Sequence, residues 1–138
     1  MTKQEFIIDT LLPYFKDPSI CGYNEKTYAC QYQTMDGRRC ALGKWVRDEK
    51  IKSVISCGDA EDVFTNYSQS DILKSEAIDI LNEDEWMIVQ SIHDNLAVKN
   101  NRPIIQNLKL LKALGIDVTL LEQEQSRLLE EDYFTVKS

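Results

Sequence analysis

Hydrophobic positions along this chain recur mostly at helical spacing. Thr2 and Glu5 match a capping box ahead of an apolar run that begins at Phe6, and Pro13 should end or kink the helix that follows. The clearest helix starts after Asn82, with an acidic first turn that suits the helix dipole. Its apolar stripe consists of Trp86, Val89, His93 and Leu96, widened by Ile92.

Cap signals predict further helices on both sides of that one. Asp59 can cap a short helix through residue 67, and Ser70 can cap another that turns Ile72, Leu73, Ala77, Ile80 and Leu81 inward. After Pro103 a helix is expected to run to a left-handed cap at Gly115. Thr119, with Glu122 three residues on, opens the last amphipathic helix.

One segment alternates with the period of a strand. In residues 27–34, TYACQYQT, successive side chains fall on opposite faces, and Asp36-Gly37 supplies a two-residue hairpin turn. In that register Cys40 lies opposite Gln33, so Cys30 and Cys40 point to opposite faces. From Cys40 the pattern becomes helical again, with Leu42, Trp45 and Val46 along one stripe.

These patterns predict an α+β fold, a mainly α-helical single domain with five to six helices and one antiparallel β-hairpin. The domain spans residues 1–138, a length that allows one buried core. Residues 51–59 are expected to form a short extended or loop segment, and residues 132–138 a tail that can fray.

Charge and composition narrow the function classes. The formal net charge of -7 predicts no general binding to nucleic acid or anionic membranes, which need clustered Lys and Arg. No segment approaches the ~20 apolar residues of a membrane span, and MTKQEFIIDT does not resemble a secretory signal. We therefore expect a cytoplasmic protein whose four cysteines are reduced and unbridged.

The cysteines and the single histidine are the first candidates for chemistry. The cysteine intervals are long and no C-x-x-C occurs, so we expect no zinc site and no cofactor. Cys40, beside Arg38 and Arg39 at a helix start, is a candidate nucleophile with His93 as its base. Asp94 lies about 100° further round the helix and is not expected to orient His93. The alternative, which we favour, is that Cys40 and His93 are core residues.

A basic segment stands out in this acidic chain. Between Arg38 and Lys52 there are six basic and two acidic residues, a net charge of +4. The candidate anion-binding residues are Arg38, Arg39, Lys44 and Arg47. The favoured alternative is that these charges are solvated or pair with the protein's own acids.

Two motifs resemble a known family. The first motif reads C-x-Y, then DGR, then CA-(V/L)-G, and the second, further along the chain, reads (L/V)Q-x-x-HD. The residues that match the first motif are Cys30, Tyr32, Asp36, Gly37, Arg38, Cys40, Ala41, Leu42 and Gly43. Those that match the second are Val89, Gln90, His93 and Asp94. Over roughly residues 28–116 the chain resembles small uncharacterised proteins of tailed bacteriophages and their bacterial hosts. It departs from them at VRDEKIK, where members often have a turn with proline. The resemblance implies a phage or prophage setting and an accessory role on host proteins.

The function we expect is therefore that of a non-enzymatic phage accessory protein that binds a host protein in the bacterial cytoplasm, with a defence factor or toxin as the class of target. The alternative is a small intracellular enzyme or an anion- or nucleotide-binding protein centred on Cys40, His93 and Arg38/Arg39. Residues 30–46 are expected to be chiefly structural, with their basic side facing solvent. Gly43 indicates close backbone approach, with the His93 helix as the expected neighbour, because glycine costs a helix about 1 kcal/mol.

Overall fold

A computed structural model describes residues 1–137. Within this range lie seven α-helices: α1 (Lys3–Lys16), α2 (Ile51–Ile55), α3 (Ala60–Asn66), α4 (Gln69–Ile72), α5 (Glu83–Ala97), α6 (Asn101–Ala113) and α7 (Thr119–Glu130). Strands β1 (Tyr23–Asn24) and β2 (Ala29–Cys30) form a two-stranded antiparallel sheet. Short 3₁₀ helices cover Pro18–Ile20, Gly43–Trp45, Asp48–Lys50 and Ser75–Ala77. The predicted α+β class is confirmed.

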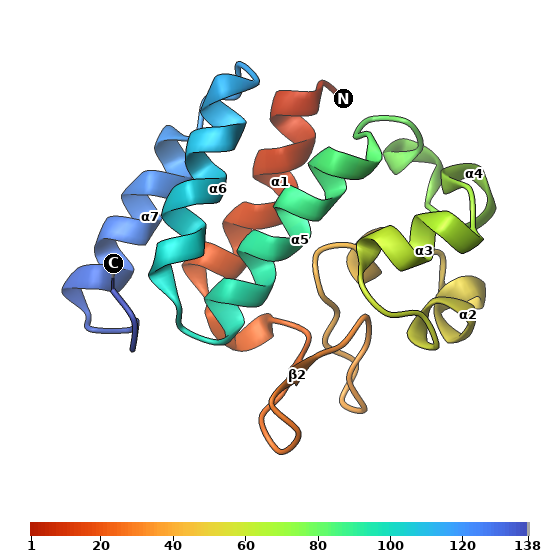
Figure 1. The fold of residues 1–138 in the computed structure, drawn as a ribbon, viewed down its shortest axis with the longest axis horizontal. Helices are drawn as coiled ribbons and strands as arrows, with labels where there is room; N and C mark the ends of the chain where they lie inside the picture. The colour runs from red at the N-terminus through yellow and green to blue at the C-terminus, as the bar shows by residue number, and fades with distance from the viewer. Residues whose placement is uncertain (138) are drawn as a thin grey trace.

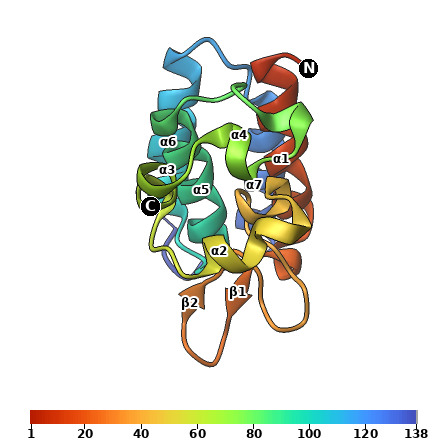
Figure 2. The ribbon, with the colours of Figure 1, turned by 90° about the vertical axis from the view of Figure 1, so that its right-hand side faces the viewer.

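Helix α5 lies at the centre of the fold. It packs against α6, α1 and α3, and α1 also packs against α7, so the four long helices stand side by side with α2–α4 beyond them (Figures 1 and 2). The predicted α5 stripe is confirmed, since all its side chains are fully buried. Trp86 meets the ring of Phe6 edge-on, with centroids 5.6 Å apart. None of these helices is long and apolar enough to cross a membrane.

Most predicted helix ends are confirmed by their hydrogen bonds. The capping boxes at Thr2 and Asn82 are both present, and Asp59 accepts from the N–H of Asp62. Gly115 ends α6 with a φ of 85°. Ser70 is not a cap: Ser68 caps α4, which is only four residues long, and the chain then extends through Leu73. The apolar residues after Leu73 therefore do not share a helix with Ile72.

Pro13 was expected to end or kink the first helix, and it does not end it: α1 continues through Pro13. A proline at this position leaves the carbonyl of Asp9 without its helical donor. The ammonium of Lys44 supplies the missing donor, 3.1 Å from that oxygen and 3.4 Å from the carbonyl of Thr10. The helix runs on to Lys16 because a distant side chain satisfies the backbone group that proline leaves free.

The sheet lies outside the predicted hairpin. Its ladder pairs Tyr23 with Cys30 and Asn24 with Ala29, whereas the turn at Asp36-Gly37 is flanked by a single bridge. That bridge joins Gln33 to Arg39 and not to Cys40. The loop is one residue longer than predicted, because the N–H of Thr34 donates to Arg38 and Gly37 adopts a φ of 89°.

The helix expected from Cys40 is reduced to the 3₁₀ turn at Gly43–Trp45. Gly43 does mark a close backbone approach, but its neighbour is the backbone of Tyr32 and not the His93 helix. Val46 then bridges to Leu73, which holds the chain extended where the helix would have continued. Cys40, Leu42 and Val46 are fully buried as predicted, while the Trp45 ring is half-buried and donates to Thr10 Oγ1.

Two regions expected to be irregular are ordered. Residues 51–55 form α2, with Ile51 and Val54 buried. In the tail, Phe134 is 2% exposed, and the N–H of Asn101 donates to the carbonyl of Val136. The tail therefore packs against the rest of the fold through residue 137; Ser138 lies outside the described residues.

Candidate functional site

His93 lies at the centre of a hydrogen-bond network that joins three segments. Its ring is completely buried, and its Nε2 accepts from the backbone N–H of Gly22 at 3.1 Å. Its Nδ1 lies 2.8 Å from Asp94 Oδ1, which also accepts from Gln90 Nε2 at 3.0 Å. The other end of the Gln90 amide accepts from the N–H of Leu42 at 3.0 Å. Helix α5 is thereby tied to the loop before β1 and to the turn after Cys40.

The network determines which nitrogen of His93 carries the proton. A backbone N–H can only donate, so Nε2 must present its lone pair to Gly22. The proton then lies on Nδ1, which donates to Asp94. His93 is a neutral imidazole with both nitrogens occupied by protein groups, and neither of them bonds Cys40.

Asp94 orients His93, contrary to expectation. Adjacent residues point about 100° apart on a helix. The aspartate side chain nevertheless bends back along the helix surface to reach the ring nitrogen. Spacing alone could not show this contact, because it depends on the side-chain torsions of both residues.

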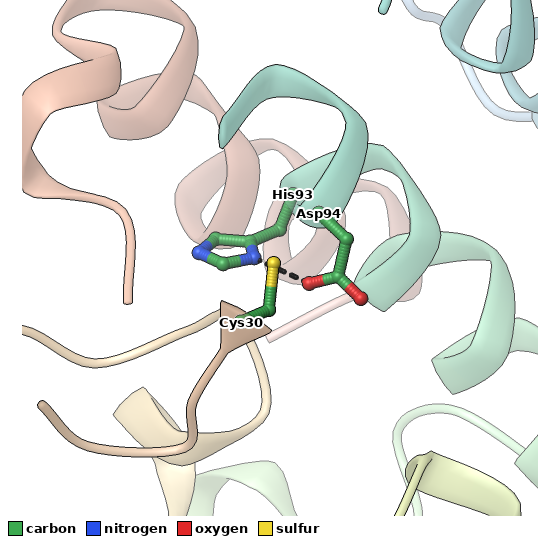
Figure 3. A group of neighbouring side chains, drawn as sticks. All are labelled: Cys30, His93 and Asp94. Atoms are coloured by element: carbon green, nitrogen blue, oxygen red, sulfur yellow. Dashed lines mark hydrogen bonds and ion pairs between the residues drawn. The ribbon is translucent and has the colours of Figure 1, made fainter. Parts of the chain in front are cut away.

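Cys30 completes a three-residue cluster with His93 and Asp94 (Figure 3). The Cys30 sulfur, a His93 ring nitrogen and an Asp94 oxygen all lie within 4.8 Å of one another. Burial raises the pKa of the Cys30 thiol well above its usual value, and the charge of Asp94 and a hydrogen bond to it add to the rise. The strand pattern around Cys30 gave no sign that this residue lies beside His93 and Asp94 of α5, so Cys30 was not among the predicted site residues.

This cluster resembles a metal site or a catalytic triad in composition but not in hydrogen bonding. A metal-binding histidine coordinates through one nitrogen and donates from the other. Here the nitrogen nearest Asp94 carries the proton, and the far nitrogen accepts. The same proton prevents Nδ1 from taking one from Cys30. For His93 to bind a metal or to take a proton from Cys30 through Nδ1, the proton would have to move to Nε2. The hydrogen bond from the N–H of Gly22 to Nε2 would then be lost.

Cys40 is equally constrained. Its sulfur is fully buried and accepts from the N–H of Gly43 at 3.3 Å. Burial raises the pKa of this thiol to about 12, although the hydrogen bond from Gly43 lowers the pKa in part. The expectation that a helix start and two arginines favour its thiolate fails, because the turn contains no α-helix and both guanidinium groups point to other partners.

Arg38 and Arg39 connect the hairpin turn to neighbouring segments through hydrogen bonds. Arg38 donates from Nε to Asp36 and from one terminal nitrogen to the carbonyl of Cys21 at 3.2 Å. Arg39 donates to Gln33 and to the carbonyl of Val46 at 3.2 Å. An anion at either guanidinium would compete with these acceptors.

Lys44 and Arg47 are engaged in the same way. Lys44 contacts the carbonyls of α1, and burial lowers the pKa of its ammonium. Arg47 donates to three backbone carbonyls at the end of α4, those of Ser70, Asp71 and Leu73. The expectation that the four basic side chains face solvent is wrong, since each is partly buried and bonded to the backbone. The favoured alternative, that they pair with the protein's own acids, holds for Arg38, Arg39 and Arg47.

Surface cavities lie in two places near the hairpin turn and α5. A groove runs along α5, with Asp59, Gln90 and Asp94 lining its middle. Arg38 lines two further cavities of about 280 Å³ each, one of them between the loops at 24–26 and 34–38.

Comparison of the chain with models of known protein families, with curated proteins and with solved structures found no match.

Proposed function

We propose that this chain is a non-enzymatic accessory protein of a bacteriophage or prophage that binds a host protein, and that it does so with its hairpin end. We define the hairpin end as residues 24–28 and 34–38. The motif resemblance supports the phage setting, with a host defence factor or toxin as the class of partner. The partner surface is argued from the geometry of the loops.

The observation that carries the proposal is the exposure of two large side chains at neighbouring loop tips. Tyr28 is 81% exposed and Met35 is fully exposed, and both loops extend beyond the helices on the same side of the molecule (Figure 1). Tyrosine and methionine are enriched in protein interfaces, where both side chains bury a large area. Loops carrying such residues on a rigid base are typical of recognition surfaces.

The base beneath these loops is held in place. Arg38 ties the second loop to residues 19–21, and Gly22 is bonded to His93 in the buried centre of α5. Asn24 caps the turn of the first loop by accepting from the N–H groups of Lys26 and Thr27. Preorganised loops lose less entropy on binding, which favours affinity.

The alternative, an enzyme or anion-binding protein, has less support. Cys30 and Cys40 have raised thiol pKa values, His93 has no free nitrogen, and Arg38 and Arg39 donate to protein acceptors. Alkylation of Cys40 in the folded protein should therefore be slow near neutral pH. Fast alkylation of Cys40 would favour the alternative.

The proposal is tested by capture from bacterial lysate followed by reconstitution with the purified partner. The Tyr28→Ser/Met35→Ser variant should lose at least about tenfold in affinity, roughly 1.4 kcal/mol, for that partner. Leu110→Ser/Leu114→Ser is the matched control, since it removes two exposed apolar side chains from α6. Equal loss in both variants, or no partner enriched over an unrelated acidic protein, would contradict the proposal.

A further inference from the structure

Three cavities with shared lining residues form one continuous groove beside α5. The central cavity, about 160 Å³, is lined by Asp59, Gln90 and Asp94 together with residues 30–32. It shares Asp59, Gln90 and Asp94 with a cavity along Met87–Asn95 of α5, and residues 30–32 and Gly58 with a cavity along residues 29–33 and 55–58. We call this feature the α5 groove.

The groove carries negative charge that the protein does not neutralise. Asp59 and Asp94 are the charged residues that line it, and no lysine or arginine is among the lining residues. Within residues 1–137 neither carboxylate forms an ion pair with a lysine or arginine. Two carboxylates facing one cavity attract a cation, and the enclosing walls reduce screening by solvent.

Asp94 is held ready for such a partner. Its Oδ1 accepts from both His93 and Gln90, which fixes the carboxylate, while Oδ2 accepts no nitrogen donor from the described residues. Figure 3 shows this second oxygen directed away from the imidazole ring. An incoming cation would therefore meet a carboxylate that two nitrogen donors already hold in place.

The groove is continuous with the hairpin end. Ala29, the residue after Tyr28, lines the cavity along residues 29–33 and 55–58. This cavity lies beside β2, which pairs with β1 along one edge only. A free strand edge beside a groove suits a peptide in extended conformation. Exposed apolar side chains at Ile55 and Met87 line the groove's two outer cavities, where residues flanking a central charge would lie.

We propose that the α5 groove binds a lysine or arginine side chain carried by an extended segment of the partner protein, with the cation between Asp59 and Asp94. This inference rests on the proposed function, since it names the part of the partner that lies beyond the hairpin end. The charge complementarity, the fixed carboxylate and the free strand edge each favour a basic extended segment over a neutral or acidic one.

A titration with a defined peptide tests the groove directly. Acetyl-Ala-Arg-Ala-amide, followed by amide chemical shifts, should perturb residues 29–33, 57–60 and 87–95, and the norleucine analogue should not. Asp59→Asn/Asp94→Asn should weaken arginine-peptide binding about fivefold or more, because both carboxylates that line the groove lose their charge. Asparagine retains the capping and accepting oxygens, and thermal unfolding checks that both variants fold.

Glu130→Gln/Glu131→Gln is the matched control, since it changes net charge equally on α7 and should leave binding unchanged. Equal weakening in this control, or shifts spread over the acidic surface, would overturn the inference. So would saturable zinc binding at Cys30, His93 and Asp94 that blocks the peptide. With purified partner, unchanged affinity of Asp59→Asn/Asp94→Asn beside loss in the Tyr28→Ser/Met35→Ser variant would overturn the groove alone and leave the proposed function intact.

Discussion

At the scale of single residues, the side chains that suggest chemistry in the sequence bind the backbone in the structure. Gln90 and His93 accept from the N–H groups of Leu42 and Gly22, and Arg47 donates to three carbonyls. Irregular segments leave such backbone groups without ladder or helix partners, and burying them unpaired is costly. The Q-x-x-HD motif thus serves to fix two loops on α5.

The proton position on His93 is a direct test of this interpretation. We expect long-range ¹H–¹⁵N spectra of the folded protein near neutral pH to show the neutral tautomer with the proton on Nδ1, because Nε2 accepts from Gly22. Addition of zinc should leave the pattern unchanged. A spectrum with the proton on Nε2 would instead make Nδ1 available to Cys30 or a metal, and the structural interpretation of the cluster would fail.

Gly43 provides a second test at this scale. A Cβ added there would overlap the carbonyl oxygen of Tyr32, a backbone atom that cannot easily move. Gly43→Ala should therefore lower the free energy of unfolding by about 3 kcal/mol or more, or prevent folding. Gly58→Ala is the control, since its nearest neighbour is the flexible Asp62 side chain at 3.4 Å. In urea unfolding, similar stability of the two variants would contradict the expected clash.

At the scale of elements, α1 shows how a tertiary contact overrides a local rule. Pro13 is a helix breaker by its own chemistry, and the sequence contains no nearby compensation. The compensating donor, Lys44, comes from 35 residues away in sequence relative to Asp9. No pattern within the helix could have shown it.

This relation predicts coupling between Lys44 and Pro13. Lys44→Met removes the donor to Asp9 and should lower the free energy of unfolding by about 1 to 2 kcal/mol. In a Pro13→Ala background the new N–H can bond Asp9, so the same change should cost less, with a coupling of about 1 kcal/mol. Lys16→Met, at the exposed end of α1, is the control and should show no coupling. Additive losses for Lys44 and Pro13 would contradict the role assigned to the ammonium.

The elements that the sequence predicted correctly are those with local determinants. The boxes at Thr2 and Asn82 and the cap at Gly115 depend on residues within one turn, and they are present. The turn after Cys40 depends on contacts of Gly43 with Tyr32 and of Leu42 with Gln90, which lie outside the turn itself. The periodicity of the segment contains no sign of those contacts, so it gave the wrong structure.

At the scale of the whole molecule, the candidate site was predicted in part. Burial of His93 followed from its place on an apolar stripe, and burial of Cys40 from the tendency of free cysteines to lie in the core; both are fully buried. The cluster with Cys30 and the groove at Asp59 require β2 and the start of α3 to meet α5, which only the folded chain determines. The sequence thus indicated the core and not the surface on which the proposed functions depend.

The buried thiols of the core make the stability of the whole molecule depend on pH. Burial raises the pKa of Cys21 and of Cys40 to about 12 in the folded protein, from an ordinary value of about 8.5 in the unfolded chain. A thiol whose pKa is higher in the folded protein than in the unfolded chain stabilises the fold fully at pH values below the unfolded pKa. This stabilisation is lost as the pH rises toward the folded pKa.

Over pH 8 to 10 the unfolded chain releases both protons while the folded protein keeps them. The free energy of unfolding should therefore fall by about 4 kcal/mol across that range. Urea unfolding with a reducing agent measures the fall, and Cys21→Ala/Cys40→Ala should make it smaller by that amount, leaving the contribution of Cys30, whose thiol pKa burial also raises. A profile that stays level from pH 8 to 10 would show that these thiols ionise as readily in the folded protein as in the unfolded chain, and so that they are not enclosed as described.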